Sequence, residues 1–230
     1  MKSFKKGYRA VIAGSTGGIG RAFLQILHND TNCGEVIGLS RSTTPHIDLL
    51  DEQTIADAAQ QIGGEVHLFV DATGFLSDHQ AGPEKSLRAI TPENMARLFA
   101  INATGPALLM KHFIPLLPRE ERGIFATLSA RVGSIGDNRL GGWHSYRASK
   151  AALNMLVRGA AIEASRTRKQ AVLTALHPGT VKTPLSEPFA ADRPRLAPED
   201  AAARLLAVID ALKPEQSGSF HAYDGTEIPW

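Results

Sequence analysis

The chain has 230 residues, 21% of which are charged, and a formal net charge of +2. This length suits one α/β domain with a sizeable core, so we expect a single domain over residues 1–230. The scattered Lys and Arg residues argue against nucleic acid as a partner. Without a run of about 18 apolar residues, the sequence predicts no membrane span and a cytoplasmic location. A single cysteine, Cys33, excludes an intrachain disulfide, and the eight histidines lack the spacing of metal ligands, so no metal is expected.

Short apolar runs rich in β-branched residues alternate along the chain with longer segments of helical periodicity. The expected strands are Tyr8–Ala13, Val36–Ser40, Val66–Asp71, Ile124–Ser129, Val172–His177 and Ser219–Tyr223. The expected helices are Gly18–His28, Asp51–Ile62, Pro92–Leu117, Ser145–Arg166 and Pro198–Leu212. This alternation predicts a Rossmann-type, doubly wound parallel sheet of about seven strands with helices on both faces. The stretch between Ser40 and Asp48 is too short for a helix, so we expect a bare loop there.

Three long segments follow the carboxyl ends of expected strands, which is the edge where open α/β sheets bind ligands. They are Gly74–Ile90, Ala130–His144 and Pro178–Ala197. The last contains Pro184, Pro188 and Pro194 and predicts a modest substrate lid over about residues 178–197.

A glycine-rich turn joins the first expected strand to the first helix and carries Gly14, Gly18 and Gly20. Such a turn permits close backbone approach, and the free N–H groups of the helix N-terminus suit a pyrophosphate. At the end of the second strand, where an NAD enzyme normally has an acidic residue, the chain has Ser40 and Arg41. A guanidinium pairs with a ribose 2′-phosphate, so we expect NADP(H) in preference to NAD(H).

Tyr146 and Lys150 lie four residues apart and therefore share one face of an expected helix. A tyrosine with a pKa of about 10 is a slow acid–base catalyst at neutral pH. The Lys150 ammonium, together with an oxidised nicotinamide, is expected to lower that pKa. Ser129 ends the preceding strand and is expected to hydrogen-bond the substrate oxygen.

These motifs together resemble the short-chain dehydrogenase/reductase family, and the resemblance runs from Tyr8 to the end of the chain. Residues 128–135, 147–154 and 223–230 resemble its C-factor or sniffer-like branch, which contains carbonyl reductases and proteins linked to cell–cell signalling. The resemblance implies an NADP(H)-dependent oxidoreductase that interconverts a carbonyl and an alcohol by hydride transfer, with Tyr146 as acid and base. It also implies a small-molecule substrate and a homodimer or homotetramer formed through paired helices.

By the same resemblance, Asn102, Ser129, Tyr146 and Lys150 are the catalytic residues, with Asn102 bonding backbone groups and holding a water that connects Lys150 to solvent. Asp71 departs from the Asn that is usual at its place, which leaves its role open. The resemblance implies cofactor contacts from Gly14, Ser15, Thr16, Gly18, Ile19, Gly20, Ser40, Arg41, Asp48, Leu49, Ala72, Thr73, Gly74, Asn102, Tyr146, Lys150, Pro178, Gly179, Val181 and Thr183.

Two other functions stay open from the sequence. One is a signalling or redox-sensing protein that binds the cofactor and acts through a partner, with incidental turnover. The other is an NAD-dependent epimerase or dehydratase, although little chain remains for its substrate domain. The insert 133–144 makes the spacing between Ser129 and Tyr146 longer than is usual, and we expect its Leu140 and Trp143 to wall a substrate pocket. The substrate itself is not specified by these motifs.

Overall fold

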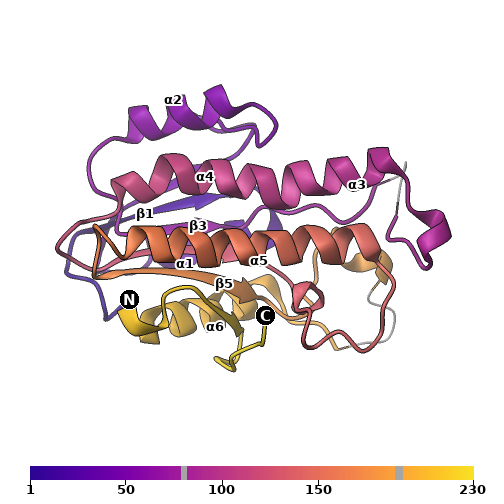
Figure 1. Ribbon diagram of the computed structural model, residues 1–230. Coiled ribbons are helices and arrows are strands. Elements are labelled where there is room, and N and C mark those ends of the chain that lie inside the picture. The colour runs from indigo at the N-terminus through magenta and orange to yellow at the C-terminus, as the bar shows by residue number, and fades with distance from the viewer. Residues whose placement is uncertain (79–81, 190–193) are drawn as a thin grey trace.

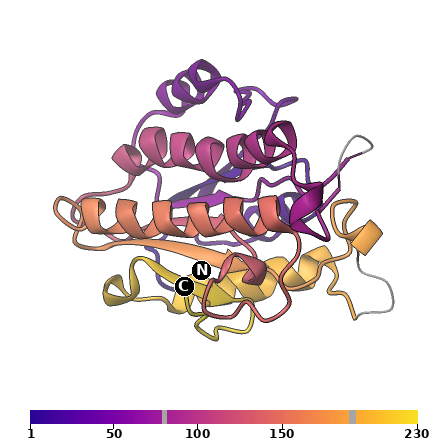
Figure 2. The same ribbon diagram turned by 45° about the vertical axis from the view of Figure 1, so that its right-hand side comes forward.

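A parallel six-stranded sheet forms the centre of the computed structural model, which describes residues 1–78, 82–189 and 194–230. The strand order is β2-β1-β3-β4-β5-β6, and every neighbouring pair is parallel. The carboxyl ends of the strands therefore meet at one edge, and the long loops gather beside it (Figure 2). The strands are β1 (Tyr8–Ala13), β2 (Cys33–Leu39), β3 (Leu68–Asp71), β4 (Gly123–Leu128), β5 (Ala171–His177) and β6 (Ser219–Ala222).

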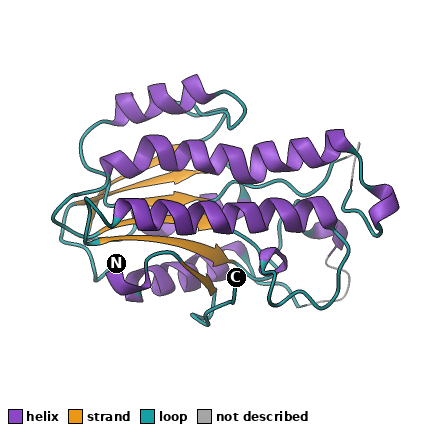
Figure 3. Cartoon of the chain, viewed as in Figure 1, coloured by secondary structure: helices purple, strands orange, loops and turns teal. Residues whose placement is uncertain are grey.

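Helices cover both faces of this sheet (Figures 1 and 3). Residues of α2, α4 and α5 pack against one face, and residues of α1 and α6 pack against the other. In the described part of the chain, none of the helices is long and apolar enough to cross a membrane. The helices are α1 (Gly18–His28), α2 (Glu52–Ile62), α3 (Pro92–Phe99), α4 (Gly105–Phe113), α5 (His144–Ala164) and α6 (Pro198–Ala211).

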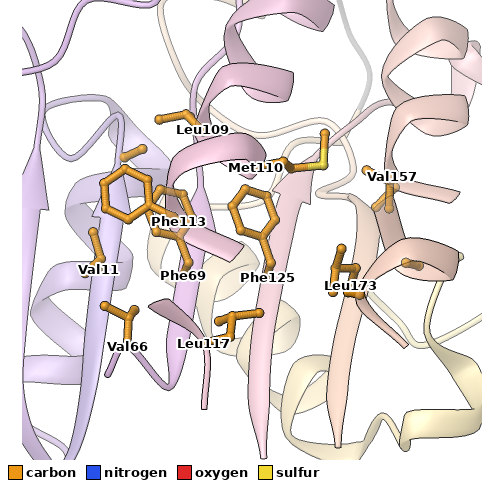
Figure 4. Packing of buried hydrophobic residues seen from close by; sticks show 14 of the residues in the cluster. Val11, Val66, Phe69, Leu109, Met110, Phe113, Leu117, Phe125, Val157 and Leu173 are labelled. Atoms are coloured by element: carbon orange, nitrogen blue, oxygen red, sulfur yellow. The ribbon is translucent and has the colours of Figure 1, made fainter. Parts of the chain in front are cut away.

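Successive side chains of the central strands alternate between the two halves of the core, as the pleat of a strand requires. Phe69 and Phe125 point toward α4 and α5, whereas their neighbours Val70 and Ile124 point toward α1 and α6. The ring centroid of Phe69 lies 4.4 Å from that of Phe113 and 4.8 Å from that of Phe125 (Figure 4). This aromatic cluster joins β3 and β4 to α4.

The predicted Rossmann-type fold is confirmed, and the bounds of β1 and α1 agree with the expected ones. The described part of the sheet has six strands instead of about seven, because residues 40–51 pass from β2 to α2 as a loop with only isolated bridges. The bare loop after Ser40 is thus confirmed. Residues 190–193 of the expected lid lie outside the described residues.

The helix expected over Pro92–Leu117 contains a π-helical turn at Ala100–Thr104, between α3 and α4. Pro106 has no N–H to donate to the carbonyl of Asn102, the bond that an α-helix requires there. The N–H of Gly105 instead bonds the carbonyl of Ala100, five residues back. Such widened turns occur frequently at functional sites, and this one carries Asn102.

Replacing Phe69 with Ala removes the ring that joins β3, β4 and α4. We expect the free energy of unfolding to fall by about 3–5 kcal/mol, because a fully buried aromatic ring leaves a cavity when it is truncated. Urea denaturation followed by circular dichroism measures this loss. The control Ile135→Ala, at a side chain that is 78% exposed, should change stability little.

Candidate active site

The turn after β1 is built so that backbone can approach backbone closely. Gly14 has a φ of +76°, and a Cβ there would lie 2.8 Å from the carbonyl oxygen of Ala72. A Cβ on Gly20 would lie 2.2 Å from the carbonyl oxygen of Gly14, so only glycine fits at both positions. Gly17 precedes α1 and provides no side-chain cap, which leaves the first N–H groups of the helix available to a ligand.

A cavity of about 870 Å³ opens beside this turn at the carboxyl edge of the sheet. Nine of the expected cofactor residues line it, namely Gly14, Thr16, Ser40, Arg41, Asp48, Leu49, Ala72, Thr73 and Gly74. Ser15 is buried beneath the turn, where its hydroxyl donates to the carbonyl of Leu39 at 3.2 Å. Gly18, Ile19 and Gly20 belong to the first turn of α1 behind the cavity wall.

Arg41 is exposed at the end of this cavity, after β2. Hydrogen bonds hold the loop that carries it: the N–H of Ser40 donates to the hydroxyl of Thr43 at 2.7 Å, and that of Ser42 donates to the hydroxyl of Ser40 at 3.1 Å. Among the described carboxylates, none forms an ion pair with Arg41. Its guanidinium is therefore available to an anion at the cavity rim.

Lys150 on α5 reaches back to the end of β4. Its Nζ donates to the carbonyl oxygen of Leu128 at 2.9 Å and lies 3.7 Å from the point where a Cβ on Gly74 would stand. Burial lowers the pKa of Lys150 to about 8, with the nearby Asp71 carboxylate acting in the opposite direction. Lys150 thus stays mainly an ammonium at neutral pH, next to a residue of the large cavity.

Tyr146 lies one helical turn earlier, and its side chain is buried. Burial raises the pKa of Tyr146 to about 12, opposite in direction to the lowering expected from Lys150. The cause is that a phenolate in this apolar surrounding loses its hydration. In the protein alone, Tyr146 is therefore in its proton-carrying form at neutral pH.

Asn102 connects the π-helical turn to two other parts of the site. Its Oδ1 accepts from the N–H of Phe75 at 2.8 Å, and its Nδ2 donates to the carbonyl of Phe75 at 2.7 Å. The same Nδ2 donates to the hydroxyl of Ser149 at 3.2 Å. Asn102 thus bonds backbone groups, as expected, and it ties the loop after β3 to α5.

Ser129 follows β4 directly, and its N–H donates to the carbonyl of Leu176 at 2.8 Å. Its hydroxyl donates to Oδ1 of Asn154 at 2.7 Å, a contact for which the sequence motifs gave no signal. Both side chains are buried.

Asp71 is a fully buried carboxylate at the end of β3. It accepts from the N–H of Thr73 at 2.9 Å, from the Thr73 hydroxyl at 2.5 Å and from the Thr127 hydroxyl at 2.6 Å. Burial raises its pKa, while these donors and the Lys150 charge act to lower it. In structural terms, Asp71 joins β3 to β4 and orders the backbone that leads to Gly74.

A second cavity, of about 480 Å³, has Tyr146 in its wall. Trp143 and Leu140 line it, as expected for the insert, together with Leu76, Val132 and Phe189. The Trp143 ring lies edge-on to Tyr146 at 6.2 Å and to Phe189 at 5.3 Å between centroids. His177 also lines the cavity, and burial lowers its pKa to about 4, so the ring is neutral at neutral pH.

The four expected cofactor contacts after β5 belong to one short segment that runs from the second cavity to the start of α1. Gly179 lines the second cavity with a φ of +77°, and Val181 is buried. The methyl group of Thr183 lies 2.9 Å from the point where a Cβ on Gly18 would stand, so this segment packs on the start of α1. Pro178 precedes Gly179 without a polar contact of its own among the described residues.

Glu84 is a functional candidate that motif reasoning missed. Its buried carboxylate accepts from the N–H and the hydroxyl of Ser145 and from Nδ2 of Asn94, while its carbonyl accepts from the N–H of Trp143. A carboxylate at a helix N-terminus is favourably placed in the helix dipole. Burial alone would raise the pKa of Glu84, but the hydrogen bonds from Ser145 and Asn94 lower it. Glu84 thus anchors the start of α5 directly before Tyr146.

No group of three or more His, Cys, Asp or Glu side chains that could hold a metal ion occurs in residues 1–78, 82–189 and 194–230.

The short-chain dehydrogenase family model described as enoyl-(acyl carrier protein) reductase matches residues 33–218. The chain therefore belongs to the short-chain dehydrogenase/reductase family of oxidoreductases, as the glycine turn and the Tyr146–Lys150 pair predict.

Two curated relatives resemble parts of the chain. C-signal of Myxococcus xanthus is 41% identical over 138 residues, which cover 60% of this chain and 79% of that protein. The 1-hydroxy-2-glutathionyl-2-methyl-3-butene dehydrogenase of Rhodococcus sp. (strain AD45) is 40% identical over 134 residues, or 58% of each protein.

Two solved structures share the fold over nearly the whole chain. The NADPH-bound carbonyl reductase from chicken fatty liver superimposes with a TM-score of 0.85 at 23% identity and covers 99% of this chain and 96% of its own. The carbonyl reductase Sniffer of D. melanogaster superimposes with a TM-score of 0.83 at 21% identity, over 98% and 100% of the two chains.

Replacing Glu84 with Gln turns an amide NH₂ group toward the N–H and hydroxyl of Ser145 and the Nδ2 of Asn94, which are all donors. We expect the free energy of unfolding to fall by about 2 kcal/mol at pH 7, since hydrogen bonds to a buried charge are lost. Because the folded pKa of Glu84 lies below its unfolded value, its stabilisation is present above the unfolded pKa of about 4.3 and is lost as the pH falls through the folded pKa.

Urea titrations of the wild type and the variant along a pH series measure this difference. A stability gap that stayed constant below pH about 4 would contradict an ionised Glu84 as the source. The matched control is Glu163→Gln, which makes the same change at an exposed position of α5, the helix that Glu84 anchors.

Proposed function

We propose that this protein is an NADP(H)-dependent oxidoreductase that interconverts a carbonyl and an alcohol, with Tyr146 as the proton donor and acceptor. The observation that carries the proposal is the position of one helical turn of α5. Lys150 lies against Gly74 of the large cavity, and Tyr146 lines the second cavity. A cofactor in the first cavity and a substrate in the second would meet at these two residues.

The large cavity fits a dinucleotide. Its glycine turn packs closely on neighbouring backbone, the first N–H groups of α1 suit a pyrophosphate, and Arg41 and Ser42 suit a 2′-phosphate. Asp48, Leu49, Ala72, Thr73 and Gly74 line the large cavity and would hold the adenosine end. Gly179, Val181 and Thr183 belong to the segment after β5, whose Thr183 packs on the start of α1, and would hold the nicotinamide end. The NADPH bound to the chicken carbonyl reductase, which shares the fold, supports this choice of cofactor.

When bound, the nicotinamide supplies or takes up the hydride. Tyr146 carries a proton at neutral pH and so is ready to donate it to a carbonyl oxygen during reduction. The Lys150 ammonium would stabilise the phenolate that remains, and Asn102 holds the loop after β3 against α5. Oxidation uses the same groups in reverse, with the phenolate accepting the alcohol proton.

The second cavity favours a substrate with an apolar or aromatic body. Leu76, Val132, Leu140, Trp143 and Phe189 form its apolar walls, while Arg131, Asp137, Arg139 and Arg147 line its charged side. Tyr146 lines the same cavity from α5, where its hydroxyl would donate a proton to the reacting oxygen. The described part of the segment 178–197 contributes Leu185, Ser186 and Phe189, in keeping with a small lid.

We also propose the homo-oligomer expected from the family. Met155, Leu156 and Ile162 leave an apolar, exposed strip on α5, which suits a paired-helix contact. Ala161, by contrast, is buried within the single chain.

Tyr146→Phe deletes the proton and little volume. We expect the turnover of an aromatic ketone with NADPH to fall by at least about 100-fold, the usual contribution of a general acid. NADPH affinity, measured by fluorescence titration, should stay close to that of the wild type. Undiminished turnover would refute the acid–base role of Tyr146 and would favour the alternative function, a cofactor-binding protein that acts through a partner.

Arg41→Asp replaces the guanidinium at the rim of the large cavity by a carboxylate. We expect NADPH affinity to fall by at least about tenfold more than NADH affinity, because a carboxylate repels a 2′-phosphate and accepts from a 2′-hydroxyl. Separate titrations with NADPH and NADH measure the two affinities. An equal loss for both cofactors would show that Arg41 does not read the phosphate.

A further inference from the structure

A third polar residue shares the helix face of Tyr146 and Lys150. Asn154 follows Lys150 by four residues, as Lys150 follows Tyr146, so the three side chains lie in one row on α5. All three are buried, and two of them meet the carboxyl end of β4, where Lys150 contacts Leu128 and Asn154 contacts Ser129. The row therefore lies beside Leu128, the last residue of β4, and Ser129, which follows it.

The orientation of the Asn154 amide is determined by its other neighbour. Its Nδ2 lies 3.4 Å from the carbonyl oxygen of Gly133 and donates to it. Rotating the amide by half a turn would place Oδ1 of Asn154 next to the carbonyl oxygen of Gly133, and two oxygen atoms without a proton between them repel each other. Oδ1 consequently faces Ser129, and the 2.7 Å contact between them uses the only hydroxyl proton that Ser129 has.

We propose that Asn154 is a positioning residue that holds the hydroxyl proton of Ser129 and presents the Ser129 oxygen to the substrate as a hydrogen-bond acceptor. The proposal rests on the proposed function and on the expectation from the sequence that Ser129 hydrogen-bonds the reacting oxygen.

Because the Ser129 hydroxyl donates to Asn154, its oxygen can accept a hydrogen bond from the substrate, and this distinguishes the alcohol form of the substrate from the carbonyl form. An alcohol has an O–H that can donate to the Ser129 oxygen while the bond to Asn154 stays intact. A carbonyl oxygen has no proton, so Ser129 can bind it only by turning its own proton away from Asn154. That turn would leave Oδ1 of Asn154 buried without a donor, which disfavours it. Asn154 thus shifts binding toward the alcohol relative to the carbonyl.

The test compares acetophenone with 1-phenylethanol, whose aromatic bodies suit the second cavity. Binding of the ketone is measured with NADP⁺ present and that of the alcohol with NADPH present, so that no reaction follows. In Asn154→Leu, which removes the acceptor, we expect the ratio of the alcohol Kd to the ketone Kd to rise about five- to tenfold. Equal weakening of both ligands is what a merely structural role produces, and it would overturn the proposal.

Two variants sharpen this comparison. Asn154→Asp keeps an oxygen for the Ser129 proton but loses the donor to the Gly133 carbonyl, so its stability should fall. Its Kd ratio, which compares two ligands in the same variant, should stay near the wild-type value. A ratio that moves as in Asn154→Leu would overturn the proposal. Glu163→Gln changes an exposed side chain on the same helix and is the control for unspecific effects.

A double-mutant cycle tests the pair without any ligand. Ser129→Ala, Asn154→Leu and the double variant are unfolded in urea, and non-additivity of about fivefold in the folding equilibrium constant is expected. Additive effects would overturn the proposal. Its failure is distinct from that of the proposed function, since loss of turnover in Tyr146→Phe is decided independently of Asn154.

Discussion

The close contact between α5 and the carboxyl end of β4 determines the geometry of the whole site. Lys150 donates to the carbonyl of Leu128, and a Cβ on Gly133 would lie 2.7 Å from the Cβ of Lys150. Only a glycine lets the loop after β4 pass this near to the helix. Because α5 is held at this distance, its row of side chains meets the end of the strand, with Lys150 against Gly74 of the large cavity and Tyr146 in the wall of the second.

Three buried ionisable residues near this contact are each compensated by hydrogen bonds. Asp71 accepts from two threonines, Lys150 donates to a backbone carbonyl, and Glu84 accepts from the start of α5. A buried charge without such partners would be costly. These hydrogen bonds oppose the effect of burial on the pKa of Asp71 and of Glu84. They also connect β3 to β4, α5 to the end of β4, and Glu84 to α3 and α5.

Much of the site was predictable because its signals are local. The glycine turn, the Tyr146–Lys150 spacing and the strand ends follow from short stretches of sequence, and the bounds of α1 were predicted to the residue. Glu84 was missed because it meets Ser145 across 61 positions of the chain, and no short motif records such a pairing. The π-helical turn was missed as well, because helical periodicity does not reveal where a ladder of hydrogen bonds widens.

By itself, the sequence determined the family, the order of strands and helices, and the edge of the sheet where the functional residues gather. These depend on patterns of hydrophobicity and spacing that act within a few turns of chain. Only the tertiary structure decided the direction of the pKa of Tyr146, the partner of Ser129 and the link from Glu84 to α5. Burial and hydrogen-bond partners depend on segments that are distant in sequence, so they exist only once the chain has folded.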